Sequence, residues 1–483
     1  MNTMNKKKKI EKMVSNLKRI ANKSVNCNIN ISISAITACS KILYHSNQLY
    51  SDNDLESLIT YISDKLKINK DYIGNYKTVL FYDGFGLDLR GWAASFVKAI
   101  NSSGYNLIYV TSKQAKGKIP NIERENHKGK TVFIEDNNYH NQIEQLNEVF
   151  SNYRPSKAFF YTTPYDVIGN VVFQRYKDHV KSYLIDLTDH AFWLGKKSTN
   201  YVLESRSLGA SIAIHKRDIS PDRIIKIDCA PYVRDSSSTD GLPFDINTTK
   251  YVYSGGQIYK TLGDEDDLYY KMVRSILLCN DSICFLYSGN GDKTKFDIIK
   301  KDFPDRLFVI NEREDFFTLM KNCVFFLNTY PVFGGLMMRY AALAKKIPLT
   351  LKYKSEADDV LLNQNDLGIE YASYDSIVEE IDKLINNDDY RMSKEEHIIG
   401  AVISEEVFLR NIKSLLETDK TDFKFSDEDI KSVDTSNFQK LYLERFDCDK
   451  MFLDAIVSKK NMWLIPYYPF LFIKKIIEKG VFY

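Results

Sequence analysis

The chain has 483 residues, of which 44% are hydrophobic and 27% are charged, and its formal net charge is +2. This composition is typical of a globular protein and excludes a largely disordered chain. The small net charge gives no reason to expect a nucleic-acid partner. Its seven cysteines form no CxxC pair, which indicates free thiols in a reducing cytoplasm. No run of about 18 apolar residues occurs, so we expect no transmembrane helix.

Residues 1–75 are predicted to form a helical N-terminal extension. Ile10, Val14 and Leu17 recur at helical spacing, and the run Lys6 to Lys9 adds positive charge. This pattern indicates a basic amphipathic helix, which either packs against the protein or lies on an anionic membrane surface.

Residues 76–220 alternate short apolar segments with connections that are compatible with helices. The segments are rich in β-branched and aromatic residues, as strands are. Continuously apolar strands are buried on both faces, which indicates a parallel sheet covered by helices. The predicted strands of this first lobe are residues 78–83, 106–111, 131–136, 157–162, 182–187 and 211–216.

Residues 221–249 contain three prolines and lack hydrophobic periodicity, and we interpret them as a linker. The alternation of strand and helix then resumes over residues 250–417, which we predict to be a second lobe. Its predicted strands are residues 250–256, 282–290, 306–311, 323–329 and 347–353, and its helices include residues 266–279, 313–321, 374–387 and 402–417.

This organisation predicts an α/β fold with two doubly wound, Rossmann-like lobes that face each other across a cleft. Ligands of such sheets bind beyond the carboxyl ends of the strands. The loops that directly follow the predicted strands are therefore the candidate site.

The loop from Asp83 to Trp92 follows the first strand and contains three glycines. It does not match a dinucleotide-binding fingerprint, because its GxGxxxxG pattern has the wrong spacing. We interpret it as a substrate loop that carries Asp88 and Arg90. The alternative is a solvated loop in which these two residues form an ion pair.

His190 follows the fifth predicted strand in the segment DLTDHAFWLG, next to an acidic residue and before Phe192 and Trp193. A histidine in this setting suits acid–base chemistry or the binding of a sugar or phosphate. A structural or solvated histidine is the alternative. The other six histidines form no HxxxH or HxH pattern, so we expect no metal site.

Three loops of the second lobe place glycines directly after a strand: residues 254–260, 288–293 and 330–339. Glycine lets another group approach the backbone closely, and the unpaired amides at a helix start attract an anion. We predict that these loops jointly bind a diphosphate, with simple tight turns as the alternative. The candidate residues are Gly255, Gly256, Lys260, Gly334, Gly335 and Arg339.

Over residues 78–417 these patterns resemble the GT-B glycosyltransferases that use nucleotide-sugar donors. The segment YVYSGGQIYK resembles the strand and loop that open the donor lobe, and residues 306–348 resemble the long donor signature. The resemblance implies that Asn311 lies near the nucleotide base. It also implies that Gly334, Gly335 and Leu336 offer backbone amides to the diphosphate.

The sequence departs from the common pattern of this family at two places. Many retaining members carry two glutamates eight positions apart, and the aligned positions here are Phe333 and Ala341. The Arg and Lys that often follow the first donor-lobe strand align with Gln257 and Leu262, although Lys260 lies close by. We therefore expect a protein outside the paired-glutamate subgroup, and the resemblance implies neither a particular sugar nor a stereochemical outcome.

The resemblance implies a glycosyltransferase that moves a sugar from a nucleotide sugar, such as a UDP-sugar, to a surface-glycan or lipid-linked acceptor without a metal or other cofactor. Gly86, Arg90 and Trp193 are the expected acceptor contacts. Asp88 is the expected general base of an inverting reaction, because a carboxylate is ionised at neutral pH. His190 then contacts the donor sugar or phosphate, or it is itself the base.

Two alternatives remain open at this stage. One is a GT-B-like partner protein that has lost catalysis, which the missing glutamates favour. The other is a sugar epimerase or polyol-phosphate transferase of the same fold. His190 and the glycine loops favour an active enzyme over the inactive partner.

Residues 418–483 are predicted to form a C-terminal extension. From Lys459 onward this segment contains five lysines, one glutamate and seven aromatic residues. Basic and aromatic residues together anchor proteins at membrane interfaces, whereas a terminal helix packed across the two lobes is the alternative. Together with the N-terminal helix, the segment predicts a cytoplasmic protein in peripheral contact with the inner face of an anionic cell membrane.

Overall fold

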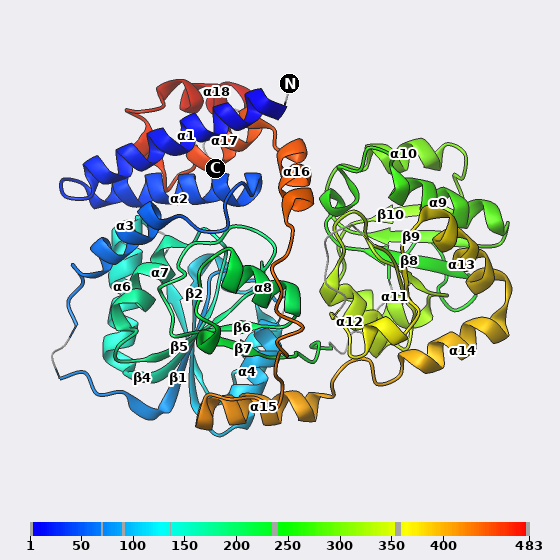
Figure 1. The fold of residues 1–483 in the computed structure, drawn as a ribbon, viewed down its shortest axis with the longest axis horizontal. Helices are drawn as coiled ribbons and strands as arrows, with labels where there is room; N and C mark the ends of the chain where they lie inside the picture. Colours follow the sequence, from blue (N-terminus) through cyan, green and yellow to red (C-terminus); the bar gives the residue numbers. More distant parts are fainter. Residues whose placement is uncertain are drawn as a thin grey trace. The chain divides into compact units, whose positions relative to one another are not determined.

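The computed structural model describes residues 3–68, 71–88, 92–135, 137–233, 240–352 and 359–479. The chain folds into two compact units (Figure 1). The first comprises Met1–Asp228 together with Leu409–Tyr483, and the second comprises Cys229–Phe408. Both terminal extensions therefore belong to the first unit, and the unit limits differ from the predicted boundaries at residues 220, 249 and 417.

The first unit is built on a parallel sheet with the strand order β3-β2-β1-β4-β5-β6-β7. The chain order reverses between β1 and β4, which is where doubly wound sheets bind ligands. Its apolar strands are buried on both faces, as predicted for a parallel sheet. The strands are β1 (Asn75–Asp83), β2 (Asn106–Ser112), β3 (Lys130–Ile134), β4 (Pro155–Tyr161), β5 (Lys181–Ile185), β6 (Tyr201–Glu204) and β7 (Ile224–Lys226).

Helices α4 to α8 connect these strands. The prediction of a strand at residues 211–216 is wrong, because this segment lies in the helix α8. Its short, continuously apolar sequence cannot distinguish a buried helix from a strand. The bounds are α4 (Ala93–Ser102), α5 (Pro120–Glu125), α6 (Tyr139–Tyr153), α7 (Val167–Tyr176) and α8 (Ser207–His215), with short 3-10 helices at η1 (Lys113–Ala115) and η2 (Pro221–Arg223).

The chain's two ends form a group of helices on the first unit (Figure 1). Ile10, Leu17 and Ile20 of α1 are buried in one hydrophobic core with α2 and α17. The apolar face of the basic N-terminal helix therefore packs against the protein. The helices of this group are α1 (Thr3–Ser24), α2 (Ile29–Ser46), α3 (Asn53–Ser63), α16 (Ser436–Arg445), α17 (Cys448–Ile456), η5 (Met462–Leu464) and α18 (Pro469–Lys479).

The second unit repeats the arrangement, with the parallel strand order β10-β9-β8-β11-β12-β13. Its chain order reverses between β8 and β11. The strands are β8 (Tyr251–Gly255), β9 (Cys284–Ser288), β10 (Leu307–Ile310), β11 (Phe326–Leu327), β12 (Pro348–Leu351) and β13 (Glu370–Tyr371). The helices are η3 (Ile258–Thr261), α9 (Leu268–Cys279), α10 (Thr294–Lys300), α11 (Phe316–Asn322), α12 (Gly335–Leu343), η4 (Gln364–Asp366), α13 (Tyr374–Asn386) and α14 (Asp388–Ile398).

Helix α15 (Glu405–Thr418) leads the chain back to the first unit. Asp419, directly after this helix, forms an ion pair with Lys181 and accepts a hydrogen bond from Tyr183, both on β5. These contacts explain why the limit of the second unit precedes residue 417. Across the described part of the chain, no helix combines the length and the apolar composition needed to cross a membrane.

Candidate functional site

The loops after β8 and β11 meet in the second unit, at the point where its strand order reverses. The Val332 amide donates to the carbonyl oxygen of Lys260 at 3.2 Å. The loop after β8 also contacts the loop after β9, because the amide of Gly256 donates to Ser288 at 3.0 Å. The structure thus brings together all three glycine loops that were singled out in the sequence.

The start of helix α12 is organised by Asn328, at the end of β11. Its side-chain oxygen accepts hydrogen bonds from the amides of Thr329 at 2.9 Å and of Gly334 at 2.8 Å. No side chain caps the helix, which begins at Gly335. The first amides of an α-helix have no partner inside the helix, so this partly exposed start carries partial positive charge.

Two glycines lie at this helix start. Gly334 has a φ of −101°, which any residue can adopt. A Cβ added at Gly334 would lie no closer than 3.4 Å to other atoms, and one at Gly335 no closer than 3.3 Å. Gly256 differs, because its φ of +128° requires glycine. A Cβ at Gly334 would contact Asn328 and Met337, and one at Gly335 would contact Phe333 and Val360, so a methyl group fits at either position only with small adjustments.

The structure distinguishes the two basic residues that were predicted to bind the diphosphate. Arg339 is only 3% exposed, and its guanidinium donates to the carbonyl oxygen of Cys229 at 3.2 Å. This placement favours a structural role for Arg339. Lys260 is half-buried on η3, and no carboxylate pairs with its ammonium group among the residues that the structure describes. Lys260 is therefore the better candidate for a phosphate contact.

Asn311 lies exposed after β10, at the same edge of the sheet. Its side-chain oxygen accepts a hydrogen bond from Lys293 at 3.1 Å. The neighbouring Glu312 carboxylate accepts from Gln257 and Asn290, each at 3.3 Å. Polar groups therefore surround the position that the sequence predicts for the nucleotide base.

In the first unit, the loop after β1 is held by the buried carboxylate of Asp83. This carboxylate accepts hydrogen bonds from the amides of Phe85 at 2.8 Å and of Gly86 at 3.0 Å, and from the Tyr109 hydroxyl. Gly86 has a φ of +60°, and a Cβ there would lie 2.8 Å from that of Ala115. Gly86 is thus needed for the loop conformation, whether or not it contacts an acceptor.

Asp88, the predicted general base, lies beside the start of helix α5. Its carboxylate accepts from the backbone and side-chain amides of Asn121, each at 2.8 Å, and from the amide of Ile122 at 3.2 Å. A carboxylate in this position satisfies the unpaired amides of a helix start and stabilises the helix. This structural task favours His190 over Asp88 as the base. Arg90, its predicted ion-pair partner, lies outside the described residues.

The buried carboxyl group of Asp83 should make the free energy of unfolding depend on pH. Burial raises the pKa of Asp83 to about 6, whereas an unfolded aspartate has a pKa of about 3.9. The folded state then binds more protons between these values, so this group's contribution to stability falls as the pH rises through them. The free energy of unfolding of the wild type, relative to Asp83→Asn, is expected to fall by roughly 2–3 kcal/mol from about pH 4 to pH 7.

Urea unfolding of both proteins across this pH range tests the prediction. The amide oxygen of the substituted side chain can still accept hydrogen bonds from the loop amides, so the comparison isolates the titration. Asp178→Asn, at an exposed carboxylate, is the control for the substitution itself. A constant difference between wild type and Asp83→Asn would contradict the assignment.

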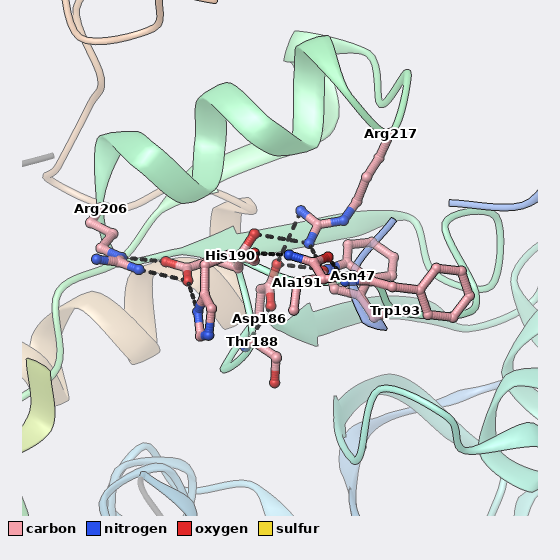
Figure 2. A network of polar contacts seen from close by, with 10 residues as sticks. Asn47, Asp186, Thr188, His190, Ala191, Trp193, Arg206 and Arg217 are labelled. Atoms are coloured by element: carbon pink, nitrogen blue, oxygen red, sulfur yellow. Dashed lines mark hydrogen bonds and ion pairs between the residues drawn. The ribbon is translucent and has the colours of Figure 1, made fainter. Parts of the chain in front are cut away.

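His190 follows β5 and belongs to a network of polar contacts (Figure 2). Its Nδ1 lies 3.1 Å from a carboxylate oxygen of Asp189. A carboxylate only accepts, so this contact places a ring proton on Nδ1 and leaves Nε2 of the neutral ring with a lone pair. Arg206 binds the same carboxylate with two guanidinium nitrogens, and Asn47 donates to the His190 carbonyl oxygen at 3.1 Å. Asp189 thereby orients the ring, Arg206 fixes Asp189, and Asn47 holds the His190 backbone.

Behind His190 the network is buried around Arg217. The Arg217 guanidinium donates to the carbonyl oxygens of Asp189 at 2.9 Å and of Ala191 at 2.6 Å, and it lies 4.5 Å from the Trp193 ring. The Trp193 indole donates to Asp186 at 2.9 Å and is only 4% exposed. This burial favours a structural role for Trp193 over the predicted acceptor contact.

Glu204, at the end of β6, is a fully buried acid beside this network. Burial is the main reason that the pKa of Glu204 lies well above its ordinary value, and the nearby Asp186 and Asp189 raise it further. Arg217 opposes this rise, but its effect is smaller than that of burial and of the two carboxylates. Burial opposes ionisation of Asp189 as well, but Arg206 outweighs it and lowers the Asp189 pKa. The cluster therefore combines a neutral acid with an ionised one.

Sequence reasoning missed five members of this network: Asn47, Asp186, Glu204, Arg206 and Arg217. Glu204 ends a strand that was not predicted, and Arg206 follows it. Arg217 follows the segment 211–216, which was taken for a strand. The available signal was the acidic residue at the end of a short apolar run, YVLE. A charged residue at a strand end is ambiguous, since solvated ends carry the same residue types.

Solved structures show the same arrangement of two α/β units. S. aureus MnaA, determined with UDP, has 14% identity and a TM-score of 0.52, covering 72% of this chain and 100% of its own. S. aureus TarM has 12% identity and a TM-score of 0.54, with 71% and 99% coverage. A putative UDP-N-acetylglucosamine 2-epimerase from Listeria monocytogenes has 10% identity, a TM-score of 0.52, and 72% and 100% coverage.

The chain has a GT-B fold. The predicted fold class is thus confirmed, although identities this low show the fold alone. The sequence matches no protein-family model and no curated protein. Which nucleotide, sugar and acceptor a GT-B protein uses depends on its site residues, because one fold supports many functions.

Proposed function

We propose that this GT-B protein is a glycosyltransferase that moves a sugar from a nucleotide sugar to a surface-glycan or lipid-linked acceptor. The observation that carries the proposal is the start of α12. It offers the first backbone amides of a helix that no N-cap side chain satisfies, at two successive glycines. An anion such as a diphosphate suits this position, because the helix start is partly positive and glycine lets a ligand approach the backbone closely.

In this proposal the amides of Gly335 and Leu336 bind the diphosphate, and Lys260 neutralises its charge. The amide of Gly334 is not available, because it already donates to Asn328. The hydrogen bond between Val332 and Lys260 supports this pairing, because it holds the two loops together. Gly255 and Gly256 form the turn that leads to Lys260, and Asn311 lies near the base. A UDP-sugar is the expected donor, and no metal or other cofactor is assigned a role.

On the acceptor side, His190 is the proposed general base. Its contact with Asp189 supports this role, because it leaves Nε2 as the proton acceptor. A base at this position would take the proton from the acceptor hydroxyl as the sugar is transferred. Asp88 stays a rival candidate despite its contacts with α5.

Nucleotide binding is the first test of the proposal. UDP is expected to raise the melting temperature of the wild type, because a ligand that binds only the folded state stabilises it. Lys260→Ala should weaken this binding by about 1.5–3 kcal/mol, or roughly 10- to 150-fold, since it removes a charge-assisted contact. Lys271→Ala, at an exposed position on α9, is the matched control. If Lys260→Ala and Lys271→Ala bind UDP with equal affinity, Lys260 does not contact the nucleotide.

Gly335→Ala provides a second test that separates binding from folding. The added methyl group would lie 3.3 Å from Phe333 and 3.5 Å from Val360, a contact that small side-chain shifts relieve, so the melting temperature without ligand should change little. Binding of UDP should nevertheless be lost or strongly weakened. If no nucleotide stabilises the wild type, the proposal of a nucleotide-sugar enzyme fails. Product analysis then distinguishes transfer, which releases the nucleotide, from epimerisation, which retains it on the sugar.

A further inference from the structure

Helix α18 presents an apolar face that no part of the described chain covers. Phe470 is 84% exposed, Ile473 is 52% exposed and Ile477 is 78% exposed. Their spacing of three and four residues places them on one side of the helix. Phe472, on the opposite side, is 2% exposed and packs into the core of the first unit. The helix is therefore held by one face and offers the other to a partner.

The segment before α18 adds aromatic groups of amphipathic character. Trp463 and Tyr467 are both exposed, at 41% and 45%. Trp and Tyr favour the boundary between water and a lipid bilayer, because their rings are apolar and their polar atoms remain hydrated.

The helices of this group carry an excess of basic residues, although Lys474 on α18 pairs with Glu478. Helix α1 belongs to the same helical group (Figure 1). Its Arg19 lies near Tyr468: burial raises the pKa of the Tyr468 hydroxyl, and the charge of Arg19 opposes this rise. Lys474 lies exposed on α18 itself, and Lys459 lies exposed before it. The exposed basic residues of α1 are Lys7, Lys8, Lys9, Lys12, Arg19 and Lys23, against a single acidic residue, Glu11.

We propose that the α18 face docks on an anionic lipid bilayer. Phe470, Ile473 and Ile477 enter the boundary of the acyl chains, and the basic residues of α1 and α18 contact the anionic headgroups. A second copy of the chain is the competing occupant of an apolar face. Docking of two copies through α18 would bring two basic α1 helices toward each other, and their repulsion opposes such a dimer. The proposal bears on the lipid-linked acceptor but does not depend on it.

Co-sedimentation with vesicles tests the proposal directly. The wild type is expected to bind vesicles that contain phosphatidylglycerol, to bind vesicles of phosphatidylcholine alone much more weakly, and to detach as salt is raised. The double variant Phe470→Glu and Ile477→Glu should lower the binding by roughly tenfold or more. The matched control is Leu278→Glu with Ile298→Glu, which places two glutamates at exposed apolar positions on helices of the second unit.

The variants also separate this proposal from the proposed function. Both positions on α18 are exposed, so the double variant should keep the wild-type melting temperature and the wild-type stabilisation by UDP. Light scattering should show a monomer. Equal vesicle binding in wild type and double variant would overturn the proposal. The proposal would also be overturned if the wild type did not bind anionic vesicles. The same holds if the wild type formed a dimer that the double variant does not form.

Discussion

Asp189→Ala is expected to lower the free energy of unfolding by about 3–5 kcal/mol, because it removes one partner of a buried ion pair. Asp189 is buried, and its carboxylate binds both Arg206 and His190. The pair lies at the carboxyl ends of β5 and β6, beside the buried Glu204 and Arg217. Loss of the carboxylate leaves the guanidinium of Arg206 buried without this counter-charge. Urea unfolding at neutral pH measures the effect.

The control for this prediction is Asp178→Ala in the same unit. The Asp178 side chain is exposed. Surface substitutions of this kind usually change stability by less than about 0.5 kcal/mol, so this variant should resemble the wild type. If the two variants lose the same stability, the network around Asp189 does not support the fold as described.

The second large effect is expected on turnover. His190→Ala should reduce the rate of sugar transfer by about 10²- to 10⁴-fold, which is the usual contribution of a general base. Asp189→Asn should also slow transfer, because an amide can donate to Nδ1 and so favour the wrong ring tautomer. The assay uses the donor identified by nucleotide binding, with each variant first shown to be folded.

His127→Ala, which alters an exposed histidine, is the control for the loss of an imidazole. Asp88→Asn tests the rival base. If Asp88 only caps α5, its variant should lose stability while the folded fraction retains most of its turnover. Near wild-type turnover in both His190→Ala and Asp88→Asn would exclude both residues from the chemistry.

The fold could be predicted well because its signals are local. Apolar strands such as residues 78–83 and 323–329, separated by amphipathic helices, indicate a parallel sheet wherever they occur. The short strands β6, β7 and β13 were missed. The helix α8 was taken for a strand because its length and apolar composition fit either structure.

By itself, the sequence determined that two α/β units succeed each other and that glycine loops and His190 follow their strands. These properties depend on periodicity and on single residue types, which the chain carries locally. Only the tertiary structure decided which charges are available to a ligand. It buries Arg339 against Cys229, engages Asp88 at the start of α5, and leaves Lys260 half-exposed beside α12. Burial and hydrogen-bond partners depend on segments far apart in the chain, and no local pattern specifies them.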